Sequence, residues 1–259
     1  MKTRHNLIIG TAFIILTALV VICSFYTIMP SDPLEGSDQL VMVVAKTRTA
    51  HRAELHVYTR DGGLWRFSFS CPVVIGESGM AWGRGLQRDS DRREVDPVKH
   101  EGDGASPEGV FQLLHAYGYL PPPMMRIKFP YTQTAPTMIC CDDETSKYYT
   151  KIIDSRDKGL NPDKLPSHEK MLRDDDLYKY TILVGHNTLK PDKGAGSCIF
   201  LHIWRGENSY TAGCTAMSEE HILRLLTWLD EKKNPVLVQL TRSNYLRLKD
   251  EWGLPEITI

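Results

Sequence analysis

The spacing of hydrophobic residues predicts mainly β-structure in the first half of the chain. The continuous apolar run 39–45 is typical of a buried strand. Over 54–77, apolar and polar residues alternate on both sides of the turn signal Arg60-Asp61-Gly62-Gly63, which predicts a β-hairpin. On the second strand of that hairpin, the residues expected on one face are Trp65, Phe67, Phe69 and Cys71.

The last third of the chain combines strand and helix patterns. Strands are predicted at 197–204 and 236–240, and a short helix at 242–252. Another helix is predicted behind Ser218, because a serine cap and acidic residues precede apolar residues at helical spacing. Those apolar residues are Ile222, Leu225, Leu226 and Leu229.

The stretch 150–175 is rich in lysine and aspartate and has few apolar residues. We expect an inert, exposed excursion here rather than a lid, with a helix at 166–173.

A long apolar run precedes all of these elements. Residues 7–29 carry no charge and follow Lys2 and Arg4. A bilayer core takes about 20 helical residues, more than the core of a secretory signal. We therefore expect a transmembrane anchor at 1–29, a linker at 30–38 and one domain at 39–259, with a cleaved signal as the alternative. The basic flank places the domain outside the cytoplasm, in the cell envelope or periplasm.

The net charge bears on the kind of partner, and the cysteine content bears on possible disulfides. The net charge is −1 at pH 7, which argues against the basic face that a nucleic-acid partner needs. Outside the cytoplasm, Cys71, Cys140, Cys141 and Cys198 can form disulfides in three pairings, and the sequence does not choose among them. Four buried free thiols are the alternative.

The candidate chemistry lies at His202 and Cys214. A thiol beside an imidazole forms a nucleophile with its general base. We expect the helix that follows to lower the pKa of Cys214, and the Gly213 turn to aim backbone N–H groups at an oxyanion. On an extended strand Cys198 lies about 13 Å from His202, outside this site. Zinc at Cys198, His202 and Cys214 is disfavoured because no C-x₂-C or H-x₃-H spacing is present, and we expect neither metal nor organic cofactor.

Four segments surround this pair in a fixed order: KHEGDG at 99–104, SPEGVF at 106–111, GAGSCIFLH at 194–202 and TAGC at 211–214. Together they resemble the L,D-transpeptidase (YkuD-like) catalytic domain, in which a histidine is followed, after a loop, by a [Ser/Thr]-x-Gly-Cys turn. The resemblance extends over 39–241.

This resemblance implies an α+β, mainly β fold, described as a β-sandwich with short flanking helices. It also implies a peptidoglycan L,D-transpeptidase in which Cys214 forms a thioester with a stem peptide, His202 acts as base, and an amine acceptor takes the acyl group. Peptidoglycan stem peptides would be the partners. The residues expected to line the substrate groove are Asn187, His186, Ser197 and Thr211, and a structural hydrogen-bonding role is the alternative for the first three.

Two positions depart from the family pattern. Ala212 replaces the histidine common before Gly-Cys, and Thr215-Ala216-Met217 replaces the Asn- or Arg-containing sequence that often follows. Donor and acceptor preferences therefore stay open. The alternatives are an L,D-carboxypeptidase or amide hydrolase on the same dyad, or a non-catalytic wall-binding domain.

Overall fold

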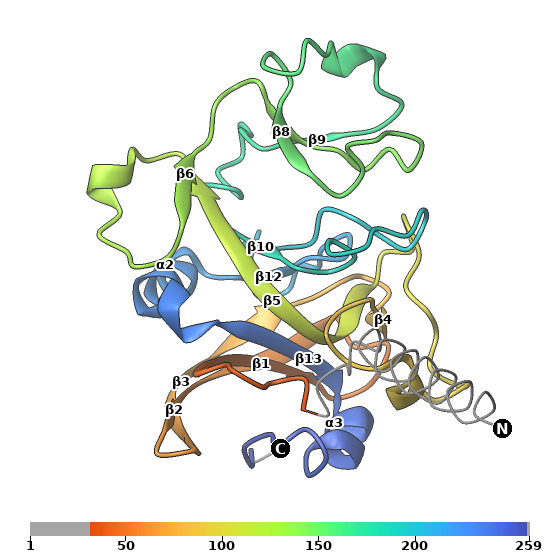
Figure 1. The fold of residues 1–259 in the computed structure, drawn as a ribbon, viewed down its shortest axis with the longest axis vertical. Helices are drawn as coiled ribbons and strands as arrows, with labels where there is room; N and C mark the ends of the chain where they lie inside the picture. The colour runs from red at the N-terminus through yellow and green to blue at the C-terminus, as the bar shows by residue number, and fades with distance from the viewer. Residues whose placement is uncertain (1–31, 258–259) are drawn as a thin grey trace, which may run out of the picture. The chain divides into compact units, whose positions relative to one another are not determined.

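In a computed structural model, which describes residues 32–257, the chain forms a large mixed sheet, a smaller three-stranded sheet and two α-helices (Figure 1). The helices are α2 (Glu219–Trp228) and α3 (Arg242–Leu248). The strands of the large sheet are β1 (Gln39–Ala45), β2 (Arg52–Asp61), β3 (Leu64–Val74), β4 (Met80–Trp82), β5 (Ser106–Gly118), β6 (Tyr131–Gln133), β10 (Tyr180–Val184), β11 (Phe200–Ile203), β12 (Thr215–Met217) and β13 (Val236–Thr241).

The large sheet closes on itself. Its strands follow the order β10-β11-β12-β3-β2-β1-β13-β5-β4, and β5 also pairs with β10. This is possible because β5 is long: Gly109–Gln112 pairs with β13, and Leu113–Gly118 pairs with β10. The mainly β fold with short helices is confirmed, but the sheet is barrel-like, which corrects the expected two-layer sandwich.

The predicted hairpin is confirmed as β2 and β3, joined at Gly62 and Gly63, which both have positive φ. The predicted single face on β3 is wrong in part. The pairing shifts between Val57 and Tyr58, and this irregularity breaks the alternation of side chains. As a result Phe67 is 59% exposed, whereas Phe69 and Cys71 lie in the barrel core.

The predicted helix behind Ser218 is confirmed as α2. The Ser218 hydroxyl accepts a hydrogen bond from the His221 N–H, which caps the first turn. Ile222, Leu225 and Leu226 are fully buried and belong to the barrel core. The short C-terminal helix is also confirmed, although α3 occupies only the first part of 242–252.

The small sheet consists of β7 (Met138–Cys140), β8 (Ile152–Asp154) and β9 (Glu169–Lys170), in the order β8-β7-β9. The helix expected at 166–173 is wrong, because Glu169–Lys170 pairs with β7 as a short strand. A disulfide joins Cys140 of β7 to Cys198, and Cys71 and Cys141 remain free thiols. The disulfide ties the small sheet to the loop that precedes β11.

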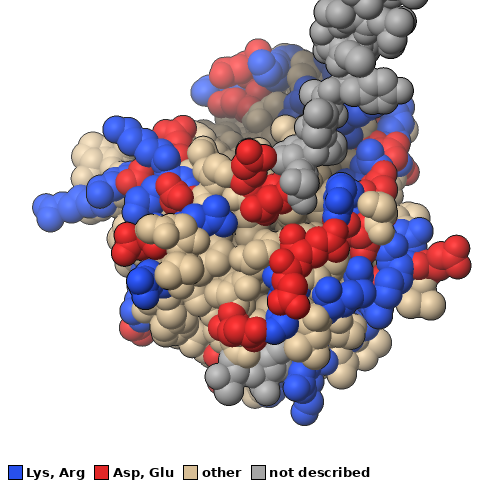
Figure 2. Space-filling view, turned by 60° about the horizontal axis from the view of Figure 1, so that its bottom comes forward, with Lys and Arg blue, Asp and Glu red and all other residues tan. Residues whose placement is uncertain are grey.

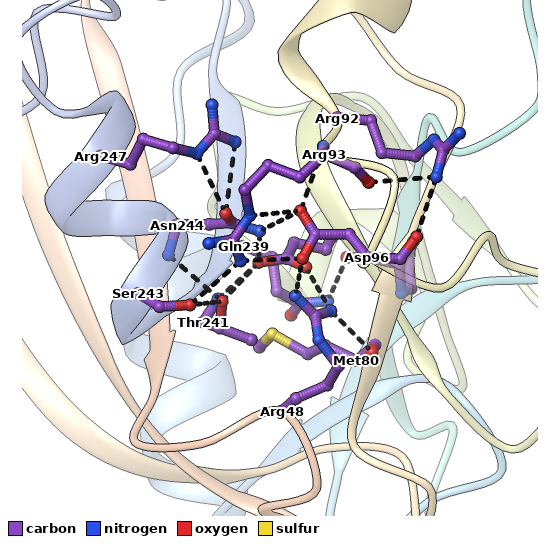
Figure 3. A network of polar contacts seen from close by, with 12 residues as sticks. Arg48, Met80, Arg92, Arg93, Asp96, Gln239, Thr241, Ser243, Asn244 and Arg247 are labelled. Atoms are coloured by element: carbon purple, nitrogen blue, oxygen red, sulfur yellow. Dashed lines mark hydrogen bonds and ion pairs between the residues drawn. The ribbon is translucent and has the colours of Figure 1, made fainter.

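A buried polar network lies where β5, β13 and α3 meet (Figure 3). Arg48 donates to Asp96 (2.5 Å) and to Glu108 (2.7 Å), two carboxylates that are almost fully buried. Thr241 and Asn244 donate to the second oxygen of Glu108, each at 2.8 Å. The network therefore fixes β5 near its start, immediately after Ser106 and Pro107.

The expected anchor at 1–29 lies outside the described residues. Within 32–257, neither helix has the length and apolar character that a bilayer crossing needs. Of the expected linker 30–38, the described part forms turns: Leu34 is buried, and the Asp38 N–H donates to Lys233 O at 2.8 Å. On the face shown in Figure 2, acidic and basic side chains are interspersed.

Candidate active site

Cys214 follows a turn that suits glycine alone. Gly213 has φ +144°, and a Cβ at this position would lie 3.1 Å from Ala105 O. The Thr211 hydroxyl donates to Cys214 O (2.6 Å) and accepts from the Gly213 N–H (3.1 Å). The Ser106 hydroxyl donates to the same Cys214 carbonyl at 2.9 Å. Two hydroxyls thus fix the backbone that carries the thiol.

The Cys214 thiol is buried beside the start of β11. Phe200 N–H donates to Sγ at 3.3 Å, and the thiol lies 3.6 Å from Cys198 O, which can accept its proton. Burial raises the pKa of Cys214 to about 12, and the negative charge of Glu169 adds to the increase. The expected lowering of this pKa is therefore wrong. Strand β12 separates Cys214 from α2, so desolvation outweighs any effect of the helix N-terminus.

The His202 imidazole is held in one tautomer. Its Nδ1 lies 2.7 Å from Ile203 O, and since a carbonyl oxygen only accepts, Nδ1 carries the proton. Nε2 then presents its lone pair. Burial lowers the pKa of His202 to about 4, so the ring is uncharged at neutral pH. The pair thus consists of a neutral thiol and a neutral imidazole.

Cys214 and His202 line one cavity of about 200 Å³. The Tyr178 ring packs edge-on against the His202 ring, with centroids 5.2 Å apart. Glu169 and Arg173 also line this cavity, and both come from the stretch 150–175. The expectation of an inert excursion is therefore wrong, because this stretch supplies two charged groups to the site. The remaining lining residues are Leu177, Trp204, Arg205, Ser209, Tyr210, Thr211, Ala212 and Ala216.

Of the four residues expected in the substrate groove, only Thr211 lines this cavity. His186 Nδ1 accepts from the Arg84 N–H, and its Nε2 lies 2.9 Å from Ala195 O, so backbone groups occupy both ring nitrogens. Burial lowers the pKa of His186 to about 4.

Asn187 and Ser197 hold the loop that leads to Cys198. The Asn187 amide donates to Asp192 O and Gly196 O, each at 2.9 Å. The Ser197 hydroxyl donates to Glu101 at 2.8 Å. Both side chains are buried, and their contacts shape the approach to β11 without entering the cavity.

Cys198 does not line the cavity, as expected, but its backbone carbonyl lies beside the Cys214 thiol. β11 begins only at Phe200, and Cys198 has φ +52°, so the chain bends here instead of running extended. Its sulfur is bonded to Cys140 and is no longer available as a metal ligand. Among residues 32–257, no group of three or more potential metal-binding side chains comes together.

The sequence profile described as YkuD, L,D-transpeptidase catalytic domain, matches residues 41–238. The chain belongs to the L,D-transpeptidase family. Members of this family are cysteine-dependent transpeptidases that act on peptidoglycan peptides. Of the two departures from the family pattern, Ala212 faces the cavity, whereas Thr215 is buried and donates to Gln239 at 2.6 Å.

Two solved structures are similar to this L,D-transpeptidase-family chain. Bd1075 of Bdellovibrio bacteriovorus is 14% identical, with a TM-score of 0.40 over 84% of this chain and 55% of that one. The helical cell shape determining protein Pgp2 of Campylobacter jejuni is 14% identical, with a TM-score of 0.34 over 78% of this chain and 48% of that one. The chain thus spans about half the length of these structures. A search of curated proteins finds no significant match.

The reactivity of Cys214 toward a small alkylating agent follows from its surroundings. With a pKa near 12, the thiolate fraction at pH 7 is about 10³-fold below that of a free thiol. We therefore expect iodoacetamide to modify Cys214 at pH 7 at least about 10²-fold more slowly than glutathione. The Cys214 rate should still rise about tenfold per pH unit above pH 9, where the glutathione rate levels off. Peptide mass spectrometry after timed quenching measures this rate. Alkylation faster than glutathione would show that the thiolate is already formed.

Proposed function

We propose that this chain is a peptidoglycan L,D-transpeptidase with Cys214 as nucleophile and His202 as general base. The observation that carries the proposal is the shared cavity, into which a buried thiol and an imidazole with a free Nε2 both open. Membership of the family supplies the substrate class.

The first half-reaction joins Sγ to the donor carbonyl. Nε2 of His202 takes the thiol proton as the Sγ–C bond forms, so no separate thiolate has to exist in the buried site. In this proposal the N–H groups of Ala212 and Cys214 stabilise the developing oxyanion, because the Gly213 N–H already donates to the Thr211 hydroxyl. When the C–N bond to the terminal D-alanine breaks, His202 returns the proton to the leaving amine. A thioester at Cys214 remains.

The second half-reaction passes the acyl group to an amine on another stem peptide. Transfer to water on the same dyad would give carboxypeptidase products.

The proposed location is the outer side of the cytoplasmic membrane, in the cell envelope. The apolar run 7–29 supports an anchor. The Cys140–Cys198 disulfide supports an oxidising compartment, since such bonds are rare in the cytosol.

The test uses the full chain in detergent with defined tetrapeptide-containing muropeptides. We expect intact mass spectra to show a thioester on Cys214 that has lost one D-alanine, followed by cross-linked dimers. If monomeric tripeptide is the sole product, the carboxypeptidase alternative replaces the transpeptidase proposal. If neither the thioester adduct nor any product forms under these conditions, the alternative of a non-catalytic wall-binding domain remains.

A further inference from the structure

Glu169 reaches the active-site cavity from outside the barrel. It lies on β9 and pairs with Cys140 of β7, whose sulfur is bonded to Cys198 next to the nucleophile. Figure 1 shows β8 and β9 standing above the barrel strands. The disulfide thus holds the strand that carries Glu169 against the loop that contacts Cys214.

Glu169 is held by a hydroxyl and not by a cation in direct contact. The Tyr178 hydroxyl lies 3.1 Å from each of its two carboxylate oxygens. Arg173 is near, but its guanidinium pairs with Asp175 at 2.7 Å and stacks over the Tyr178 ring. Within the described part of the chain, no lysine or arginine forms an ion pair with Glu169. Burial is the main reason why the pKa of Glu169 is raised to about 7, and the charges of Asp142 and Glu101 add to the increase. The Tyr178 hydroxyl and the charge of Arg173 act in the opposite direction. The carboxyl of Glu169 therefore gains and loses a proton near neutral pH.

The proposed second half-reaction needs a group that can take up a proton near neutral pH. A primary amine has an ordinary pKa of about 8–10 and enters the cavity mainly as an ammonium ion, which is not a nucleophile. His202 ends the first half-reaction neutral, having returned its proton to the leaving amine. It can accept the one proton that nitrogen loses as it attacks, and pass it to Sγ. The extra proton of the ammonium ion needs a second proton acceptor. Hydrolysis does not need one, because a water molecule brings no extra proton.

We propose, on the basis of the function proposed above, that Glu169 binds the acceptor ammonium group and takes its extra proton, and thereby favours transfer to amines over hydrolysis. The ammonium ion gives H⁺ to the Glu169 carboxylate and becomes a neutral amine. The amine nitrogen then bonds to the thioester carbon, the C–S bond breaks, and His202 moves the second nitrogen proton to Cys214. The products are an amide, a thiol and a protonated Glu169, which returns its proton to solvent.

Protonation of Glu169 also helps the sulfur of Cys214 to leave. The carboxylate charge of Glu169 disfavours a negative sulfur at Cys214. Once Glu169 is protonated, that repulsion is gone at the step in which sulfur leaves. Tyr178 orients the carboxylate through its hydroxyl while its ring contacts both His202 and Phe200.

The test is the partition of the thioester in Glu169→Gln. The full chain is acylated with a defined tetrapeptide muropeptide, with D-methionine as the amine probe, and amide and hydrolysis products are counted by mass spectrometry. We expect thioester formation at the parent rate or faster, and a ratio of amide to hydrolysis at least about 10-fold lower. The parent ratio should rise through pH 7 and level off. The variant ratio should climb instead toward pH 9–10, following the free amine.

Two further variants sharpen the result. Glu207→Gln makes the same substitution on the exposed loop between β11 and β12, outside the cavity, and should keep the parent ratio. Tyr178→Phe removes the hydroxyl from Glu169 but keeps the ring, and should lower the ratio less than Glu169→Gln.

An unchanged partition in Glu169→Gln, with normal thioester formation, would overturn this assignment while leaving the proposed function intact. Loss of the thioester itself in that variant would also overturn it, by placing Glu169 in the first half-reaction. A parent protein that never forms the thioester would overturn the proposed function instead.

Discussion

Cys214→Ala is expected to lower product formation from tetrapeptide muropeptides at least about 10³-fold, to the limit of detection. The reason is that the described cavity holds no second thiol: Cys71 lies in the barrel core, and Cys141 does not line the cavity. The measurement is a time course of cross-linked and hydrolysed products by mass spectrometry, with the intact mass of the protein followed in parallel. The thioester adduct should vanish together with both products.

A matched control separates chemistry from folding. Cys71→Ala makes the same substitution at another buried free thiol, on β3, and should keep activity within about threefold. Both variants remove one sulfur atom from the interior, so each should lower the free energy of unfolding by only about 1 kcal/mol. Undiminished activity in Cys214→Ala would sink the proposed mechanism, whatever the stability of the variant.

Elements with a strong local pattern were predictable from the sequence. The β2–β3 hairpin has two glycines at the one place where its strands reverse, and α2 has a serine cap followed by a complete apolar stripe. In both cases neighbouring residues alone determine the conformation. The placement of His202 and Cys214 in one cavity was anticipated from motif order, because a short loop connects β11 to the Cys214 turn.

Features that depend on distant partners were not predictable. Nothing local marks Cys198 as the residue where the backbone adopts a positive φ, yet that bend brings its carbonyl to the Cys214 thiol. Glu169 stands in a polar stretch typical of a solvated loop. Only its pairing with Cys140, far away in the sequence, carries it to the cavity.

The direction of the pKa shift of Cys214 was also not predictable from the sequence. Sequence distance to Ser218 suggested a helix N-terminus beside the thiol, but β12 uses the intervening residues to pair with β11. Closure of the barrel likewise depends on a partner choice, since β5 pairs with β13 along one part and β10 along another. The alternation of apolar and polar residues along one strand does not reveal which strands will pair with it.

Arg48→Ala is expected to lower the free energy of unfolding by about 3–5 kcal/mol at pH 7. The substitution leaves Glu108 buried without a cation and Asp96 with Arg93 alone, at side-chain exposures of 0% and 1%. Urea unfolding followed by tryptophan fluorescence measures the change. Arg84→Ala is the matched control, because Arg84 pairs with Asp192 in an exposed ion pair, and it should cost about 1 kcal/mol or less.

The loss in Arg48→Ala should depend on pH in a defined direction. Burial alone would raise the pKa of Asp96, but hydrogen bonds from Arg93 and Asn244 and the charge of Arg48 outweigh it and hold the pKa below its usual value. A lowered pKa contributes stability above the unfolded value of about 3.9, and that contribution disappears as the pH falls through the folded value. The parent should therefore lose stability below pH 4, and the difference between parent and Arg48→Ala should shrink there. A difference that stays constant from pH 7 to pH 3 would mean that Arg48 acts through packing and not through its charge.

The network also connects to the backbone that carries Cys214. Glu108 is held two residues after Ser106, whose hydroxyl fixes the Cys214 carbonyl, and Gln239 links Pro107 O to Thr215 on the other side of Cys214. If Arg48→Ala loosens the start of β5, the folded fraction of the variant should also acylate more slowly. An acylation rate per folded molecule equal to that of the parent would show that the network stabilises the barrel without positioning Cys214.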